Sequence, residues 1–261
     1  MTTRVDAGGL ARAVDRVRSN RTASLKSNYF FGRLRAQEFP LWETDQSLVF
    51  LDREHDFQRV YFLSSELTDL SNLLHAIPQR PLVADYVTQS DDEAEVNSAM
   101  AAAGFRKAAL YRRMSNNNLA ARTAKAGSSI QRAREDEAEG LFEQLCQHFN
   151  VRLDRIPRRD EFVELVRRGQ VLVHRQGEEI DGYNIYQLLG RRAHWNYWYI
   201  RPGTHRAVAF KLIEDMYSEM RDKGINAAFL WVEQHNLGVI EVHKRLGFEF
   251  DGLVTHVYVK E

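Results

Sequence analysis

The sequence predicts an α+β fold in which mixed β-sheets are covered by helices and one order of elements occurs twice. Apolar residues make up 44% and charged residues 28% of the 261 residues, a balance typical of a globular protein. Short apolar runs with strand character alternate with amphipathic runs of helical period along the chain. The Asn-, Ala-, Gly- and Ser-rich stretch "SNNNLAARTAKAGSS" interrupts this periodicity, so we expect domains at 1–115 and 130–261 joined by a linker at 116–129.

In the first half, "SLVFLD" and "RVYFL" are expected to be buried strands joined by a turn at "REHD". The run "SSELTDLSNLLHAI" has one apolar stripe at helical spacing, and Ser65 is available as its N-cap. A strand "PLVADYV", a helix "EAEVNSAMAAAG" that ends at Gly104, and a last strand "FRKAALYRRM" complete this half.

The second half repeats the order more fully. Two helices, "EDEAEGLFEQLCQHF" and "RRDEFVELVRRG", precede three antiparallel strands within "QVLVHRQGEEIDGYNIYQLLGRRAHWNYWYI". "AVAFKLIEDMYSEMRDKG" is the clearest helix, with one apolar face and Gly224 after a basic last turn. The strand "AAFLWV", a short helix, and the strand "LVTHVYVK" follow. "AAAGFRKAALYRRM" and "KRLGFEFDGLVTHVYV" both read helix, Gly-Phe, strand, which indicates an internal duplication.

Charge and cysteine content exclude several classes of protein. Lys plus Arg and Asp plus Glu both number 36, so the chain lacks the basic excess on which nucleic-acid binding depends. The single cysteine, Cys146, excludes an internal disulfide framework and fits a reducing compartment. No apolar run has the length of a signal peptide core or of a membrane span, and we therefore expect a cytoplasmic protein without a membrane partner. No Cys/His cluster with metal-ligand spacing is present, so no metal site is expected.

The segment "YIRPGTHRAVAFKL" places small residues at the start of the long helix. With the elements around it, this segment resembles the coenzyme A loop of the GNAT superfamily of acyl-CoA-dependent N-acyltransferases. In that family a glycine-rich turn opens a helix whose backbone N–H groups hold the pyrophosphate, because a helix N-terminus offers unpaired donors and a partial positive charge. The family's loop pattern falls on Thr204, Ala207 and Ala209, with alanines in place of glycines.

The resemblance covers residues 130 to 261 and implies two GNAT-like mixed-sheet domains in tandem, with acetyl-CoA or another acyl-CoA as co-substrate. The residues that it assigns to the coenzyme are Ile200, Thr204, His205, Arg206, Ala207, Val208, Ala209 and Asn236. The alternative for this segment is an ordinary helix start capped by Thr204.

The stretch "NLGVIEVHKRLGF" also resembles the family, which has a tyrosine where this chain has His243. That tyrosine is thought to protonate the leaving thiolate or to hydrogen-bond the thioester sulfur. A histidine with a pKa near neutrality can act as such an acid, so we expect His243 to be catalytic. The alternative is a core histidine satisfied by a backbone carbonyl, since Val239, His243 and Leu246 share one helical stripe.

The remaining candidates follow from their strands. Glu233 ends "AAFLWV" and is the candidate general base, although a carboxylate that ends a strand is often only solvated. Tyr197 and Tyr199 alternate with Trp198 and are candidates to line the substrate pocket, although strand aromatics are more often core residues. The first half has "SSELTDL" where the loop should be, so Glu66 and Asp69 would repel a pyrophosphate, and we expect a degenerate, structural copy.

These observations favour an N-acetyl- or N-acyltransferase that moves an acyl group from acyl-CoA to the amine of a small molecule such as an amino acid or amino sugar. The alternative is a non-catalytic pseudo-acetyltransferase that serves as a binding or regulatory module. A transferase with an aminoacyl-tRNA donor is disfavoured by the neutral charge. The expected partner is therefore a small-molecule amine, with no nucleic acid and no membrane, and a homodimer is an admissible assembly.

Overall fold

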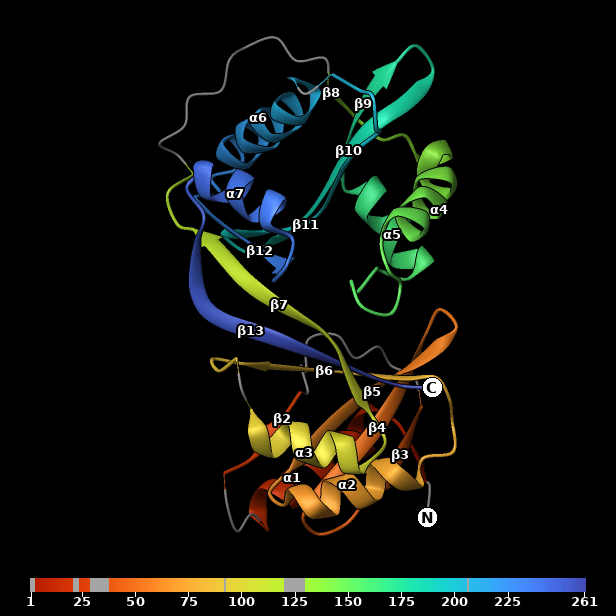
Figure 1. Ribbon diagram of the computed structural model, residues 1–261. Helices are drawn as coiled ribbons and strands as arrows, with labels where there is room; N and C mark the ends of the chain where they lie inside the picture. The colour runs from red at the N-terminus through yellow and green to blue at the C-terminus, as the bar shows by residue number, and fades with distance from the viewer. Residues whose placement is uncertain (1–2, 21–23, 29–37, 92, 120–129, 206) are drawn as a thin grey trace. The chain divides into compact units, whose positions relative to one another are not determined.

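The computed structural model describes residues 3–20, 24–28, 38–91, 93–119, 130–205 and 207–261, and the chain divides into two compact units (Figure 1). The first unit consists of residues 1–111 together with the C-terminal segment 252–261. The second unit consists of residues 112–251. No helix in the described part of the chain is both long enough and apolar enough to cross a membrane.

The first unit has a sheet in the order β1-β3-β4-β5-β6-β13, with β2 paired to β5. Strands β3, β4 and β5 are antiparallel, whereas β5 and β6 run parallel because helix α2 connects them. The elements of this unit are β1 (Thr3–Val5), α1 (Ala7–Ser19), β2 (Lys26–Ser27), β3 (Phe39–Glu43), β4 (Ser47–Glu54), β5 (Phe57–Ser64), α2 (Leu67–Ala76), β6 (Leu82–Thr88), α3 (Ala94–Ala102), the first part of β7 (Arg106–Asn116) and most of β13 (Glu249–Lys260).

Two apolar clusters lie on opposite faces of this sheet. Helix α1 packs on one face through Leu10, Val14 and Val17, while α2 and α3 cover the other face. A buried ion pair is also present, in which Arg59 Nη1 lies 2.9 Å from Asp85 Oδ2 and both side chains are 1% exposed. The Nε of Arg59 donates to Glu54 at 2.7 Å, so the buried guanidinium is compensated by two carboxylates.

The second unit repeats this topology. Its sheet order is β7-β12-β11-β10-β9-β8. Strands β9, β10 and β11 are antiparallel, whereas β11 and β12 are parallel and are connected by helix α6. Its elements are the end of β7, β8 (Ile130–Arg132), a 3₁₀ turn (Glu135–Glu137), α4 (Ala138–His148), α5 (Arg159–Arg167), β9 (Val171–Gln176), β10 (Glu179–Leu189), β11 (Arg192–Ile200), α6 (Ala207–Asp222), β12 (Ala227–Glu233) and α7 (Leu237–Arg245). The repeated order agrees with the predicted duplication.

Helices cover both faces of the second sheet, α6 and α7 on one and α4 and α5 on the other (Figure 1). Alternation along β12 sends Ala228, Leu230 and Val232 to the core under α6 and α7. Alternation along β11 sends Tyr197 and Tyr199 to the opposite core, under α4 and α5. The sheet therefore separates two apolar layers.

The last strand of each half completes the sheet of the other unit. β13 follows α7 in sequence, yet its residues 254–260 pair antiparallel with β6 in the first unit. β7 follows α3, yet its end adjoins β12 in the second unit. The division into 1–115 and 130–261 differs from this partition, because local patterning identifies a strand but does not identify its partner. Most of the expected linker, residues 120–129, lies outside the described residues.

Candidate functional site

The candidate site of the second unit lies where β11 and β12 stop pairing. Their parallel register covers only three pairs, Arg192 with Ala227, Ala193 with Ala228, and His194 with Phe229. Both strands continue beyond this point, to Ile200 and to Glu233. The strands therefore form a split that is closed at the His194–Phe229 pair.

A β-bulge lies next to the closed end of the split. The register between β10 and β11 shifts between Ile185 and Tyr186, which pair with Tyr197 and Trp195. Asn196 is thus left without an opposite residue on β10. Bulges re-aim side chains and backbone groups and are frequent beside active sites. A bulge bends its strand, so β11 bends just after His194, its last residue paired with β12.

His243 packs against the split from helix α7. Asn236 caps this helix by accepting a hydrogen bond from Val239 N at 3.3 Å. The His243 side chain is 4% exposed, and its ring meets Trp195 edge-on with 4.6 Å between ring centroids. Burial lowers the pKa of His243 to about 4, so the imidazole is neutral at pH 7. This does not support the premise that His243 has a pKa near neutrality.

Three buried polar atoms around the split lack hydrogen-bond partners among the described residues. They are Nδ1 of His243, Nε1 of Trp198 and Oδ1 of Asn196. The rings of His243 and Trp198 are neighbours, with centroids 6.2 Å apart. A buried donor or acceptor without a partner costs about 1–3 kcal/mol, so such atoms at one place indicate a polar ligand or water that satisfies them. The absence of a carbonyl partner at Nδ1 also weighs against a purely structural histidine.

The N-terminus of α6 follows the open end of the split. Ala207 is exposed and is the first residue of the helix, and its N–H is accepted by Nδ1 of His205 at 3.1 Å. The His205 ring therefore caps the first N–H of the helix. In the alternative of an ordinary helix start, Thr204 was the expected cap. The turn before the helix is closed by Thr204 N, which donates to Arg201 O at 3.1 Å. Arg206 lies outside the described residues.

Close packing on β10 fixes this helix. A Cβ atom added at Gly182 would lie 2.8 Å from Ile200 Cδ1 and 3.1 Å from Leu212 Cδ1, so a larger residue would force these side chains to shift. Ile200 and Leu212 belong to the core beneath α6, as does the buried Val208. Ala209 is half-buried beside it. The residues assigned to the coenzyme, apart from Arg206, thus lie at the end of β11, in the loop that follows it, at the start of α6 and at the cap of α7.

The other predicted residues have structural contacts of their own. Glu233 is half-buried at the end of β12, and its Oε2 accepts from His235 N at 2.8 Å. The Tyr197 hydroxyl lies 2.9 Å and 2.7 Å from the backbone carbonyls of Asp154 and Arg155, to which it donates. Tyr199 stacks on His148 with 3.5 Å between ring centroids. Glu233, Tyr197 and Tyr199 face the side of α4 and α5, whereas His243 lies on the side of α6 and α7.

The sequence analysis did not identify Trp195, Trp198 or Asn196 as site residues. Strand alternation placed Trp198 opposite the two tyrosines, which was the available signal. The bulge at Asn196 and the unpaired state of the indole N–H depend on pairing with β10 and β12. No local pattern in the sequence encodes these two features.

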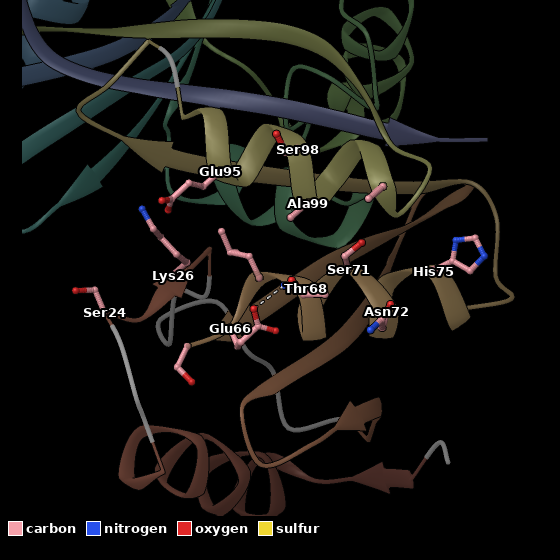
Figure 2. Close-up of a pocket in the computed structure, with 13 residues that line it drawn as sticks. Ser24, Lys26, Glu66, Thr68, Ser71, Asn72, His75, Glu95, Ser98 and Ala99 are labelled. Atoms are coloured by element: carbon pink, nitrogen blue, oxygen red, sulfur yellow. Dashed lines mark hydrogen bonds between the residues drawn. The ribbon is translucent and has the colours of Figure 1, made fainter.

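The corresponding place in the first unit is occupied by the chain itself. Glu66 caps α2, and its carboxylate accepts from Thr68 N at 3.1 Å and Asp69 N at 2.6 Å. These hydrogen bonds lower the pKa of Glu66. The cap is therefore Glu66, whereas the sequence had indicated Ser65. A groove of about 1090 Å³ runs between α2 and α3 beside it, and Figure 2 shows Ser24 and Lys26 toward one end, His75 at the other, and Glu66 between them. A bound pyrophosphate would have to displace this internal carboxylate.

Comparisons with known proteins agree with the tandem fold described above. Residues 133–248 match the acetyltransferase (GNAT) family. A tandem GNAT protein from the clavulanic acid biosynthesis pathway has a similar structure, with a TM-score of 0.59, 14% identity, and coverage of 100% of this chain and 98% of that chain.

Two further solved structures share the fold. The GCN5-related N-acetyltransferase from Sphaerobacter thermophilus has a TM-score of 0.56 and 13% identity, over 83% of this chain and 76% of that one. A GNAT-family acetyltransferase from Colwellia psychrerythraea has a TM-score of 0.56 and 11% identity, over 99% and 98%. Among curated protein sequences, none matches the chain. The fold is thus α+β, with two GNAT-like mixed-sheet domains in tandem, and residues 133–248 of the second half match the GNAT acetyltransferase family.

Proposed function

We propose that this protein is an N-acyltransferase that moves an acyl group from acetyl-CoA or another acyl-CoA to the amine of a small molecule. The observation that carries this proposal is the split between β11 and β12, where three buried polar atoms lack partners. The family match implies acyl transfer from an acyl-CoA and leaves the acceptor open. The chemistry would be direct attack of the amine on the thioester carbonyl.

The residues present fit such a co-substrate at two places. The exposed N-terminus of α6 offers a partial positive charge to the pyrophosphate, which would take the Ala207 N–H in place of the His205 ring, with Ala207 leaving room for its approach. The unpaired Nε1–H of Trp198 and Oδ1 of Asn196 match the carbonyl and N–H groups of the coenzyme's amide-bearing arm. When bound, the co-substrate supplies the activated acyl group. The protein holds it in the split and keeps water away from it.

The low pKa of His243 limits the role that this residue can have in the reaction. A group with a pKa of about 4 is protonated in roughly one molecule in a thousand at pH 7, so the imidazolium is a minor species. The neutral ring still carries one N–H, which can donate to the sulfur as charge develops there. We therefore assign His243 a hydrogen-bonding role toward the leaving sulfur. Of the two roles that the resemblance gave to the family's tyrosine, this burial favours the second.

Glu233 is the candidate that receives the proton of the amine. Its Oε2 is held by the backbone of His235, which leaves Oε1 for a water or for the amine. In this proposal the first unit has a structural role and takes no part in the chemistry. Its equivalent helix start is closed by Glu66, and the last strand of its sheet comes from the C-terminal end of the chain.

The test is a matched pair of charge insertions at helix starts. Ala207→Glu places a carboxylate at the first residue of α6, where it would repel the pyrophosphate and occupy its donors. Ala94→Glu makes the same change at the exposed first residue of α3 in the first unit. We expect Ala207→Glu to weaken acetyl-CoA binding at least tenfold in calorimetry and Ala94→Glu to leave it unchanged. Equal binding by the parent and both variants would refute the assignment of this helix start.

The non-catalytic alternative is favoured by one observation, which is that alanines replace the glycines expected in the loop. Under that alternative the purified protein neither binds acetyl-CoA nor releases free coenzyme A with any amine. Mass spectrometry of the purified protein for bound coenzyme A species distinguishes the two functions before any acceptor is known.

A further inference from the structure

The second sheet carries arginine and aromatic side chains on the face turned away from α6 and α7. Leu230 and Val232 of β12 point into the core beneath those helices, so Phe229 and Trp231 point to the opposite face. Both are half-buried. His194 of β11 pairs with Phe229 in register, and their rings stack with 4.5 Å between centroids and an interplanar angle of 8°.

Two guanidinium groups lie against these rings. The Arg113 Cζ atom is 5.4 Å from the ring centroid of Phe229 and 5.9 Å from that of Trp231. The Arg192 Cζ atom is 5.6 Å from the ring of Phe229. We call Arg113, Arg192, His194, Phe229 and Trp231 the arginine–aromatic surface. All five residues belong to the second unit.

This surface has an excess of positive charge. Arg113 Nε donates to Asp251 at 2.7 Å, which compensates one guanidinium. Within the described residues, no carboxylate pairs with Arg192, whose side chain is exposed at the start of β11. A guanidinium that stacks on a ring keeps its N–H edge available, and its fork of donors matches a carboxylate or a phosphate. The arrangement therefore favours an anionic group over a neutral one.

The position of the surface relates it to the proposed reaction. His194 and Phe229 are the last paired residues before β11 and β12 separate, so the surface adjoins the closed end of the split. Trp195 and His243 pack together at this end on the other face of the sheet. An acceptor on the arginine–aromatic surface would thus approach the split from the side opposite α6 and α7.

We propose that the acyl acceptor is an amine that also carries an anionic group, a carboxylate or a phosphate, and that Arg192 together with Arg113 binds this group. The inference rests on the proposed function and deepens it by naming the class of acceptor. Neutral amines lack the group that Arg192 recognises. A neutral acceptor would therefore be held at the split only through contacts of its amine, without the contact to Arg192.

Two matched pairs of acceptors test this proposal. L-phenylalanine and 2-phenylethylamine differ by a carboxylate, and glucosamine 6-phosphate and glucosamine differ by a phosphate. Transfer is measured as coenzyme A released from acetyl-CoA, and binding of each acceptor is measured separately by calorimetry. We expect kcat/KM for the anionic member of one pair to exceed that of its neutral partner at least tenfold. The pair that shows the preference identifies the anion as carboxylate or phosphate.

The variant that tests the residue is Arg192→Gln. Its control is Arg191→Gln, because Arg191 is the exposed residue directly before it, in the turn that precedes β11. Arg192→Gln should reduce the preference for the anionic acceptor about tenfold and leave the Kd for acetyl-CoA within twofold. Arg191→Gln should keep the preference. A preference that survives in Arg192→Gln, or the absence of binding by both anionic compounds, overturns the proposal.

The outcomes also separate this inference from the function on which it rests. If neutral amines are acetylated as fast as anionic ones, the acyltransferase stands and the anion site is wrong. If an anionic amine binds in an Arg192-dependent manner without acyl transfer, the anion site stands and the proposed function is wrong.

Discussion

The burial of His243 predicts a specific change in how stability depends on pH. In the folded protein its pKa is about 4, against an ordinary value of 6.5. The folded pKa is depressed, so between pH 6.5 and pH 4 the unfolded chain binds a proton at this residue that the folded protein does not bind. Stability is therefore lost as pH falls through this window. Above pH 6.5 the neutral ring costs the folded state nothing from this effect.

The magnitude follows from the shift. Each pKa unit corresponds to about 1.4 kcal/mol, and pH 5 lies about 1.5 units below the ordinary histidine value. From pH 7 to pH 5, His243 should thus lower the free energy of unfolding by about 2 kcal/mol. His243→Phe keeps an aromatic ring against Trp195 and removes the titrating group. The other histidines are present in both proteins, and their contributions cancel in the difference.

The assay is urea unfolding of the full chain at pH 7 and at pH 5, followed by tryptophan fluorescence. Trp195, Trp198 and Trp231, three of the four tryptophans, belong to the second unit and report on it. We expect the parent to lose about 2 kcal/mol more than His243→Phe between the two pH values. His235→Phe, which removes an exposed histidine just before α7, should behave as the parent does. If His243→Phe loses as much stability as the parent, His243 is not held neutral by burial.

Glu66→Ala should lower the stability of the first unit by about 1 kcal/mol, because two N–H groups of α2 lose their acceptor, and should leave acetyl-CoA affinity unchanged in calorimetry. Gly182→Ala should lower the melting temperature through overpacking worth about 1–3 kcal/mol, since its Cβ would meet Ile200 at 2.8 Å. Gly140→Ala is the control within a helix, where nothing lies within 4 Å of the added Cβ, and should stabilise by about 0.5–1 kcal/mol. Asp85→Ala should cost about 3–5 kcal/mol in urea unfolding, because it leaves the Arg59 guanidinium buried beside Glu54 alone.

Each of these expectations has a contradicting result. Tighter acetyl-CoA binding by Glu66→Ala would show that the first unit holds the coenzyme and that Glu66 competes with it. A Gly182→Ala variant as stable as the parent would mean that the Ile200 and Leu212 side chains can shift without cost. An Asp85→Ala variant of unchanged stability would show that water reaches Arg59.

Local patterns in the sequence determined most of the elements and their order. The turn at "REHD" lies between β4 and β5, where His55 has a φ of 44°. The helix predicted after Arg206 runs from Ala207 to Asp222 as α6, because its apolar residues recur at helical spacing. The α+β class and the tandem order follow from these periodicities. Helix α1 was not anticipated from the sequence.

Tertiary structure alone decided the partners of β7 and β13 and the environment of His243. A strand's pattern shows which face is buried, but its hydrogen bonds go to residues that are distant in sequence, so β13 could pair with β6 without any local sign. Likewise, the helical position of His243 was visible in the sequence, whereas its pKa depends on burial against Trp195 of β11 and Phe248, which lies just before β13. The charge state of a side chain is set by how many neighbours exclude water from it, and only the folded chain brings those neighbours together.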